Sequence, residues 1–365
     1  MSGPQFTLSY VFVLLWVLCQ AQQAATQQPS SSVGPPSPAE IPQLQAKAKA
    51  GDPDAQLRLG RAYDDGINVP RSDREAAKWY KAAAEQGNAT AQDNLGLMFR
   101  SGRGVEQDKV EAVKWYSKAA RQRNPAAMFN LGTAYYNGDG VGIDDVAAYA
   151  WFLLAENFGS QSAVDAVRHM KEEKGNLEAD ALEKIGDMYD KGDGLPQSRS
   201  DAIDWYRKAA ENGTASVQIK LSNQLLRLGV DSIYPEVHRL CDKAAKLRYP
   251  PGIYCMGLLY QRGWGVSRDP AQAAKWFGEA INMGYPAAML QLGKMYWNGE
   301  GVKQDKIAAY EFVSLAAVFL TEAKEEKEDF AKQMTPKELE KGQDRATKWV
   351  REHPPNQPLV LSRRP

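Results

Sequence analysis

A period of 36 residues runs through most of the 365-residue chain and constrains its fold more than any other feature. Ala55, Ala91 and Ala127 open three consecutive blocks at this spacing. Each block continues with Leu-Gly or a close variant, an aromatic residue, a Gly-rich turn and an aromatic-rich segment that ends in alanines. Self-similarity at a period of about 20–50 residues is the signature of stacked repeats, so we expect a solenoid.

The first half of each block predicts a helix with a glycine inside it. In the first block the helix begins after the N-cap Asp52, with Pro53 at its first position. Glycine inside a helix costs about 1 kcal/mol relative to alanine, so its recurrence predicts a place where two helices approach closely. The helical glycine recurs as Gly60, Gly96, Gly132, Gly186, Gly257 and Gly293.

The second half of each block predicts an antiparallel helix after a Gly-x-Gly turn such as Gly102-Arg103-Gly104. Glycine supplies the backbone angles that other residues resist. Each turn joins two helices, whereas a glycine-rich phosphate cradle needs a preceding strand, so we expect no nucleotide site. The second helix carries an aromatic pair: Trp79-Tyr80, Trp115-Tyr116, Trp151-Phe152, Trp205-Tyr206 and Trp276-Phe277.

The string A-x-x-x-L-G-x-x-Y-x-x-G-x-G-V-x-x-D-x-x-x-A-x-x-W-Y-x-K-A-A resembles the Sel-one-like repeat (SLR) family, a relative of the tetratricopeptide repeats, over residues 52–318. The resemblance implies an all-α, right-handed α/α superhelix of about seven helix-pair repeats. It also implies a protein or peptide partner bound on the concave face, an inference that rests on fold analogy.

Departures from the repeat divide the chain. The block at 217–251 is degenerate, because Ser222 replaces the helical glycine, Cys241 replaces the tryptophan, and the Gly-x-Gly turn is missing. Charged helices are predicted after the third and seventh blocks, at about 162–174 and 320–333. We therefore predict repeats one to three plus an extra helix over 52–174, repeats four to seven over 175–318, capping helices over 319–353 and a disordered tail over 354–365, with a bend or break between the two arrays.

The N-terminal region predicts export. Leu8 to Cys19 is an uncharged, mostly apolar run of about a dozen residues, shorter than the ~20 that span a bilayer. It fits the apolar core of a signal peptide over 1–21, cleaved after Ala21 and followed by a Pro/Ser/Gln-rich flexible linker over 22–51. A retained anchor or a lipidated Cys19 stays open. We expect a secreted or periplasmic protein with no integral membrane segment after signal removal.

Composition and motifs argue against several activities. Lys+Arg and Asp+Glu both number 45, and this zero net charge does not favour nucleic-acid binding. His169, His238 and His353 lie far apart in the chain, so no metal site is predicted. H-E-x-x-H, G-x-S-x-G and P-loop patterns are missing from the sequence, so we expect neither an enzyme nor a bound cofactor.

Two body cysteines could form a disulfide in an oxidising compartment. Cys241 and Cys255 fall on consecutive antiparallel helices. Cys241 takes a buried tryptophan position, whereas Cys255 takes a slot held in other repeats by Arg58, Asn94, Asn130 and Gln291. Disulfide geometry is demanding, so the sequence leaves the pairing open.

Three aromatic residues depart from the repeat pattern. Tyr136 and Trp297 directly follow the aromatic of the first helix, where other repeats have Asp64, Arg100, Asp190 or Gln261. Trp264 occupies a turn position that is polar or small elsewhere. Tyrosine and tryptophan are enriched at binding hot spots, which makes all three candidate partner contacts. Packing against a neighbouring repeat or an extra helix is the alternative.

These features favour a secreted or periplasmic scaffold that mediates protein–protein interaction. One alternative from the family is a cell-wall or penicillin-binding hydrolase, although the cysteine pairs in every repeat that mark those relatives are missing from this sequence. A second alternative is an adaptor subunit of a eukaryotic endoplasmic-reticulum degradation complex. The sequence chooses neither the partner nor the oligomeric state.

Overall fold

The computed structural model describes residues 34–175 and 177–352. Within these ranges the chain forms helices and turns and no strand, and consecutive helices pack in pairs. This confirms the predicted all-α solenoid of helix-pair repeats. The predicted signal peptide over 1–21, the predicted tail over 354–365 and His353 lie outside the described residues.

The chain divides into two compact units, Met1–Trp205 and Tyr206–Pro365. The division lies inside α11 (Arg199–Asn212), whereas the sequence placed the boundary between residues 174 and 175. The difference arises because α10, the first helix of the fourth repeat, packs against α8 of the third repeat. The fourth repeat is therefore the one that contains the division.

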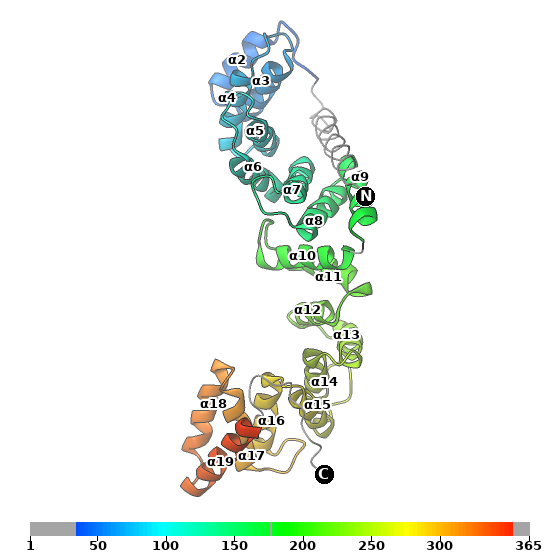
Figure 1. The fold of residues 1–365 in the computed structure, drawn as a ribbon, viewed down its shortest axis with the longest axis vertical. Helices are drawn as coiled ribbons and strands as arrows, with labels where there is room; N and C mark the ends of the chain where they lie inside the picture. Colours follow the sequence, from blue (N-terminus) through cyan, green and yellow to red (C-terminus); the bar gives the residue numbers. More distant parts are fainter. Residues whose placement is uncertain (1–33, 176, 353–365) are drawn as a thin grey trace, which may run out of the picture. The chain divides into compact units, whose positions relative to one another are not determined.

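The first unit stacks helix pairs upon one another, as Figure 1 shows for α3 to α8. The second helix of each pair packs on the first helix of the next, and α9 and α10 both pack on α8. The helices of this unit before α11 are α2 (Ile41–Lys49), α3 (Pro53–Asp65), α4 (Asp73–Glu85), α5 (Ala89–Ser101), α6 (Lys109–Arg121), α7 (Pro125–Asn137), α8 (Asp145–Asn157), α9 (Gln161–Lys174) and α10 (Glu178–Lys191).

Helix α2 corrects the prediction that residues 22–51 form a flexible linker. Ile41, Leu44 and Ala48 lie on one face of α2 and are buried in a cluster with Leu59 of α3. The first helix pair of a solenoid has an apolar face with no preceding repeat to cover it. Helix α2 covers that face, and the Pro/Ser-rich composition just before it hid the three apolar residues at helical spacing.

The glycines inside the first helices mark close helix–helix contact, as predicted. A Cβ atom built on Gly96 would lie 2.5 Å from a ring carbon of Tyr116 on α6, and one on Gly60 would lie 2.7 Å from the ring of Tyr80 on α4. A side chain at these positions would clash with a buried aromatic ring. The same relation joins Gly132 to Phe152 and Gly257 to Phe277.

The second unit continues with helix pairs and ends in two further helices. The degenerate block keeps a packed pair, α12 and α13, with the short 3-10 helix η1 in place of the Gly-x-Gly turn. Helices α18 and α19 pack on α17, and Phe330 and Ala346 join the core of the last repeats. The elements are α12 (Ala215–Leu226), η1 (Asp231–Ile233), α13 (Tyr234–Lys246), α14 (Pro250–Arg262), α15 (Pro270–Asn282), α16 (Pro286–Asn298), α17 (Lys306–Ala316), α18 (Thr321–Lys332) and α19 (Pro336–Glu352).

A disulfide joins Cys241 on α13 to Cys255 on α14, with their Cα atoms 5.8 Å apart. Both residues are buried in the contact between these two helices. The sequence left this pairing open because the two repeat slots differ. The structure shows that the tryptophan slot of one second helix faces this slot of the next first helix.

Removing the disulfide should destabilise the second unit by about 3 kcal/mol, because a cross-link that closes a loop of about 15 residues restricts the unfolded chain by that amount. The test is urea unfolding, followed by circular dichroism, of wild type and of a Cys241→Ala, Cys255→Ala variant. Wild type in reductant should unfold like the variant, and the variant should not respond to reductant. Equal stability of the variant and oxidised wild type would contradict the expectation.

Candidate protein-interaction surface

The repeats share recurring core contacts but differ at the residue where each first helix meets its turn. We call this position the end row: the residue that directly follows the aromatic of each first helix, where the helix gives way to its turn. In the first unit the end row contains Asp64 on α3, Arg100 on α5, Tyr136 on α7 and Asp190 on α10, and in the second unit it contains Gln261 and Trp297. The character of the end row therefore changes from acidic to basic to aromatic over the first three repeats and is acidic again in the fourth.

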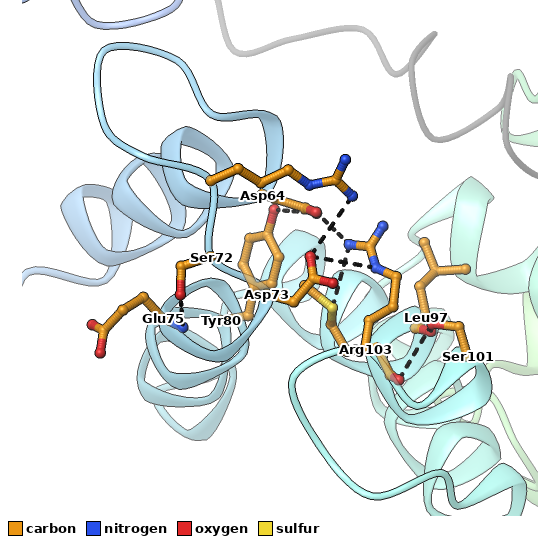
Figure 2. A network of polar contacts seen from close by, with 10 residues as sticks. Asp64, Ser72, Asp73, Glu75, Tyr80, Leu97, Ser101 and Arg103 are labelled. Carbon is orange, nitrogen blue, oxygen red and sulfur yellow. Dashed lines mark hydrogen bonds and ion pairs between the residues drawn. The ribbon is translucent and has the colours of Figure 1, made fainter.

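Asp64 is the centre of a polar network between the first two repeats (Figure 2). Its carboxylate accepts a hydrogen bond from the Tyr80 hydroxyl at 3.2 Å and pairs with the Arg103 guanidinium. The Nε atom of Arg103 also lies 3.8 Å from a carboxylate oxygen of Asp73. Tyr80 belongs to the same repeat as Asp64, while Arg103 comes from the turn of the next repeat. The network therefore joins one repeat to the next.

The next repeat carries the same positions with every charge reversed. Arg100 stands where Asp64 stood, Lys109 where Asp73 stood, and Asp139 where Arg103 stood, each 36 residues further along. Lys109 Nζ lies 2.6 Å from an Asp139 carboxylate oxygen, so the turn of the third repeat is tied to the second as before. The framework is thus retained while its electrostatic sign is inverted.

The reversal affects Tyr116, which occupies in α6 the position that Tyr80 has in α4. Arg100 offers only hydrogen-bond donors, so it cannot accept from the Tyr116 hydroxyl as Asp64 accepts from Tyr80. Tyr116 is 1% exposed, and among the described residues its hydroxyl has no hydrogen-bond partner. Burial raises the pKa of Tyr116, and the nearby charge of Arg100 opposes this rise.

A buried carboxyl group lies beside this position. Asp93 on α5 is 1% exposed, and its Oδ1 atom accepts a hydrogen bond of 2.8 Å from Asn130 Nδ2 on α7. Burial raises the pKa of Asp93 to about 6, although the Asn130 hydrogen bond and the charge of Arg100 both lower it. The equivalent residues in the flanking repeats are Leu57 and Phe129, so this carboxyl group stands in an otherwise apolar slot.

Asp93→Asn should stabilise the chain at neutral pH by about 3 kcal/mol, since a shift of about two pKa units corresponds to roughly that free energy. Below about pH 3 the carboxyl group is neutral in both the folded and unfolded states. As pH rises from about 3 to 6, the unfolded chain loses the proton before the folded chain does, so the stability of wild type falls and then levels off. The asparagine keeps an acceptor for Asn130 and has no proton to lose.

The measurement is the free energy of unfolding in urea at several pH values between acidic and neutral. The free energy of unfolding of the Asp93→Asn variant should exceed that of wild type by an amount that increases as pH rises. Glu106→Gln, at an exposed position in the turn after α5, is the control and should follow wild type throughout. Parallel pH profiles for Asp93→Asn and wild type would show that burial does not shift the Asp93 titration.

The structure places the three predicted aromatic contacts against their own chain. The Tyr136 hydroxyl donates to a carboxylate oxygen of Glu173 on α9 at 2.6 Å. Trp297 stacks on Phe330 of α18 with ring centroids 4.0 Å apart. Trp264 stacks on Tyr234 of α13 with centroids 5.7 Å apart. All three are half-buried. The packing alternative is therefore observed at each site, and contact with a partner stays a prediction.

The described residues also limit other kinds of site. His169 lies 3.3 Å from Glu173 on α9, and His238 lies on α13 of the other unit. No group of three or more His, Cys, Asp or Glu side chains in residues 34–175 and 177–352 could hold a metal ion. In the same ranges, none of the helices has both the length and the apolar character that crossing a bilayer would require.

Sequence reasoning did not identify the Asp93–Asn130 pair or the Arg100–Tyr116 position. Both sites can be detected when the blocks are aligned, because a charged residue stands where neighbouring repeats have an apolar residue or the opposite charge. The alignment does not give the distances between side chains of different repeats. Asn130 and Asp93 come from different repeats, so their contact depends on how the repeats stack.

Solved structures and a curated protein resemble the chain. The crystal structure of c5321, a protective antigen present in uropathogenic Escherichia coli strains that displays an SLR fold, is 23% identical, covers 97% of this chain and 96% of its own, and has a TM-score of 0.46. A Sel1 repeat protein from Oxalobacter formigenes is 28% identical, with 87% and 89% coverage and a TM-score of 0.37.

The curated protein is the ERAD-associated E3 ubiquitin-protein ligase component HRD3B of Arabidopsis thaliana. It is 31% identical to this chain over 122 residues, which is 33% of this chain. The match spans only 19% of the length of HRD3B. The likeness therefore concerns a set of repeats rather than the whole protein.

The family comparison agrees with the helix pairs. The Sel1 repeat model matches residues 53–88, 89–124, 125–157, 179–214, 250–285 and 286–317, together more than half of the chain. Each match contains one first helix and one second helix, and the degenerate pair α12–α13 lies between the fourth and fifth matches. The chain belongs to the Sel1 repeat family.

Proposed function

We propose that this protein is an exported scaffold that binds a protein or peptide partner along the end row and the adjoining faces of its first helices. The observation that carries the proposal is the contrast between recurring core contacts and a variable end row. Glycine–aromatic contacts recur in four repeats, while the end row of the first three repeats changes from Asp64 to Arg100 to Tyr136. Repeat proteins bind partners on extended surfaces of this kind.

Two features support export. The sequence predicts a signal peptide over residues 1–21, and a disulfide between Cys241 and Cys255 is typical of proteins that fold in an oxidising compartment. Expression of the full-length chain in a secreting host, with N-terminal sequencing of the exported product, tests this part. The expected first residue is Gln22, and a product that keeps Met1 and stays with the membrane would contradict cleavage.

Site-specific photo-crosslinking tests the binding surface. A photoreactive amino acid is placed at the exposed Asp65 or Ser101, next to the end row, or at the exposed Lys78 or Lys114 on the second helices. The mature chain is then incubated with extracts of its native envelope or secretory fraction. We expect a shared crosslinked protein from the first two positions and none from the last two. Equal crosslinking from both sets, or no product at all, would contradict the proposal.

A second candidate is an adaptor for membrane-associated protein degradation, favoured by the 31% identity to HRD3B, itself named as a component of a ubiquitin ligase. The same crosslinking experiment separates the two ideas. Ubiquitin-ligase subunits among the products would favour the adaptor. A partner unrelated to ubiquitin transfer would favour an independent scaffold. Turnover of a β-lactam or cell-wall fragment by the purified chain would support a hydrolase instead.

A further inference from the structure

The buried tyrosine hydroxyl of the second helix has a carboxylate acceptor in the first repeat but not in the second. In the first repeat, the Asp64 carboxylate accepts from the buried Tyr80 hydroxyl and pairs with a guanidinium group. In the second repeat, Tyr116 presents the same hydroxyl from the equivalent position of α6, but the end-row residue is Arg100. The chain therefore supplies a donor and a positive charge at this place. Within the described residues no carboxylate accepts a hydrogen bond from the Tyr116 hydroxyl, although the charges of Asp93 and Asp139 act on it.

The two acids near Arg100 hydrogen-bond or pair with other residues, although Asp93 also interacts with Arg100 through its charge. Asp139, the acid that reaches this place from the next turn, is paired with Lys109 at 2.6 Å. Asp93 is buried and accepts from Asn130. Within the described ranges, no carboxylate forms an ion pair with the Arg100 guanidinium and the Tyr116 hydroxyl has no acceptor. A buried hydroxyl without an acceptor is unfavourable, which gives an incoming acceptor a favourable position to fill.

We propose that Arg100 and the Tyr116 hydroxyl form a recognition point for an acidic side chain of a peptide partner. The aspartate or glutamate carboxylate of the partner takes the place that Asp64 has one repeat earlier. One carboxylate oxygen accepts from the Tyr116 hydroxyl, and the Arg100 guanidinium pairs with the same group, a charge-assisted contact that Arg forms well. This inference rests on the proposed function and adds the chemical class of the ligand.

The position is reachable from the end row. Arg100 is half-buried at the C-terminal end of α5, beside exposed Ser101, so its long side chain borders solvent. The Tyr116 hydroxyl itself is buried in the free chain, so the proposal requires the side chains that cover it to move when the carboxylate arrives. The neighbouring Lys109 adds positive charge on the same side, although Asp139 neutralises most of it.

Nuclear magnetic resonance titration of the mature chain tests the proposal. The probes are two acetylated, amidated pentapeptides, Ala-Ala-Glu-Ala-Ala and Ala-Ala-Gln-Ala-Ala, added up to the millimolar range. We expect the glutamate peptide to shift the Arg100 Nε–Hε signal and to bind about tenfold more tightly than the glutamine peptide, as one charge-assisted hydrogen bond predicts. Equal binding of the two peptides, or no shift of Arg100, would overturn the proposal.

Matched variants locate the site. Tyr116→Phe keeps the ring against Gly96 and removes only the hydroxyl, so it should weaken glutamate-peptide binding about tenfold, as should Arg100→Gln. Tyr80→Phe removes a hydroxyl whose acceptor is already Asp64 and should leave binding unchanged. Circular dichroism should show equal helicity for all three. Equal effects of Tyr116→Phe and Tyr80→Phe would count against the site.

The two proposals fail in different ways. If the partner captured by photo-crosslinking binds Arg100→Gln as well as wild type, the scaffold stands and the carboxylate site is wrong. If crosslinking finds no partner, the scaffold proposal fails, while the peptide titration still reports on Arg100 and Tyr116 directly.

Discussion

Gly140→Ala should destabilise the first unit by about 3 kcal/mol. The added Cβ atom would lie 2.2 Å from the carbonyl oxygen of Lys109, at the start of α6 in the preceding repeat. The φ angle of Gly140 is +77°, a region that alanine adopts only with strain. Overpacking and backbone strain of this kind each cost about 1–3 kcal/mol. Urea unfolding followed by circular dichroism measures the loss.

The same turn provides the control. A Cβ atom at Gly142 would meet nothing within 4 Å, and Gly142 does not have a positive φ angle. Gly142→Ala should therefore stay within about 0.5 kcal/mol of wild type. Hydrogen exchange should increase most in α6 and α7 of the Gly140→Ala variant, since the turn holds these two repeats together. Equal stability of the two variants would show that the turn shifts at little cost.

Phe277→Ala should have a comparably large effect in the second unit, about 3–5 kcal/mol, because it removes a fully buried ring from the core. Phe277 is 0% exposed, it packs against the Tyr254 ring with centroids 5.6 Å apart, and a Cβ on Gly257 would lie 2.4 Å from one of its ring carbons. The variant should unfold at a lower temperature and at a lower urea concentration than wild type.

Two further variants sharpen this test. Phe319→Ala removes a ring that is 58% exposed and should change stability by less than about 0.5 kcal/mol. Combining Phe277→Ala with Gly257→Ala should recover part of the lost stability, since the new methyl group enters the space that the ring has left. If Gly257→Ala is equally harmful with and without the ring, the glycine has a role other than admitting the aromatic side chain.

The helix pairs and their close contacts could be predicted because repetition reveals them. A glycine that recurs inside a helix at Gly60, Gly96 and Gly257 carries a cost at each position, and its contact with an aromatic ring explains why it is kept. The candidate aromatic contacts were harder. Tyr136 and Trp297 depart from the pattern, and the sequence does not show that α9 and α18 supply their partners Glu173 and Phe330.

What the sequence could not provide is the placement of one repeat against the next. The disulfide between Cys241 and Cys255 depends on which slots of α13 and α14 face each other. The linker prediction failed at α2, because three apolar residues are too few to stand out from the polar composition of the segment. In both cases the outcome depends on a contact between two helices, α13 with α14 and α2 with α3, that the repeat pattern does not specify.

The charge reversal between the first two repeats has a consequence for folding. A chain of similar blocks can mispair, with a turn docking one block away from its proper neighbour. If the turn of the third repeat docked on the first repeat instead of the second, the Asp139 carboxylate would lie against Asp64 and Asp73. Like charges would then meet in the misdocked interface. The reversal of charge between the first two repeats therefore disfavours this mispaired arrangement by electrostatic repulsion.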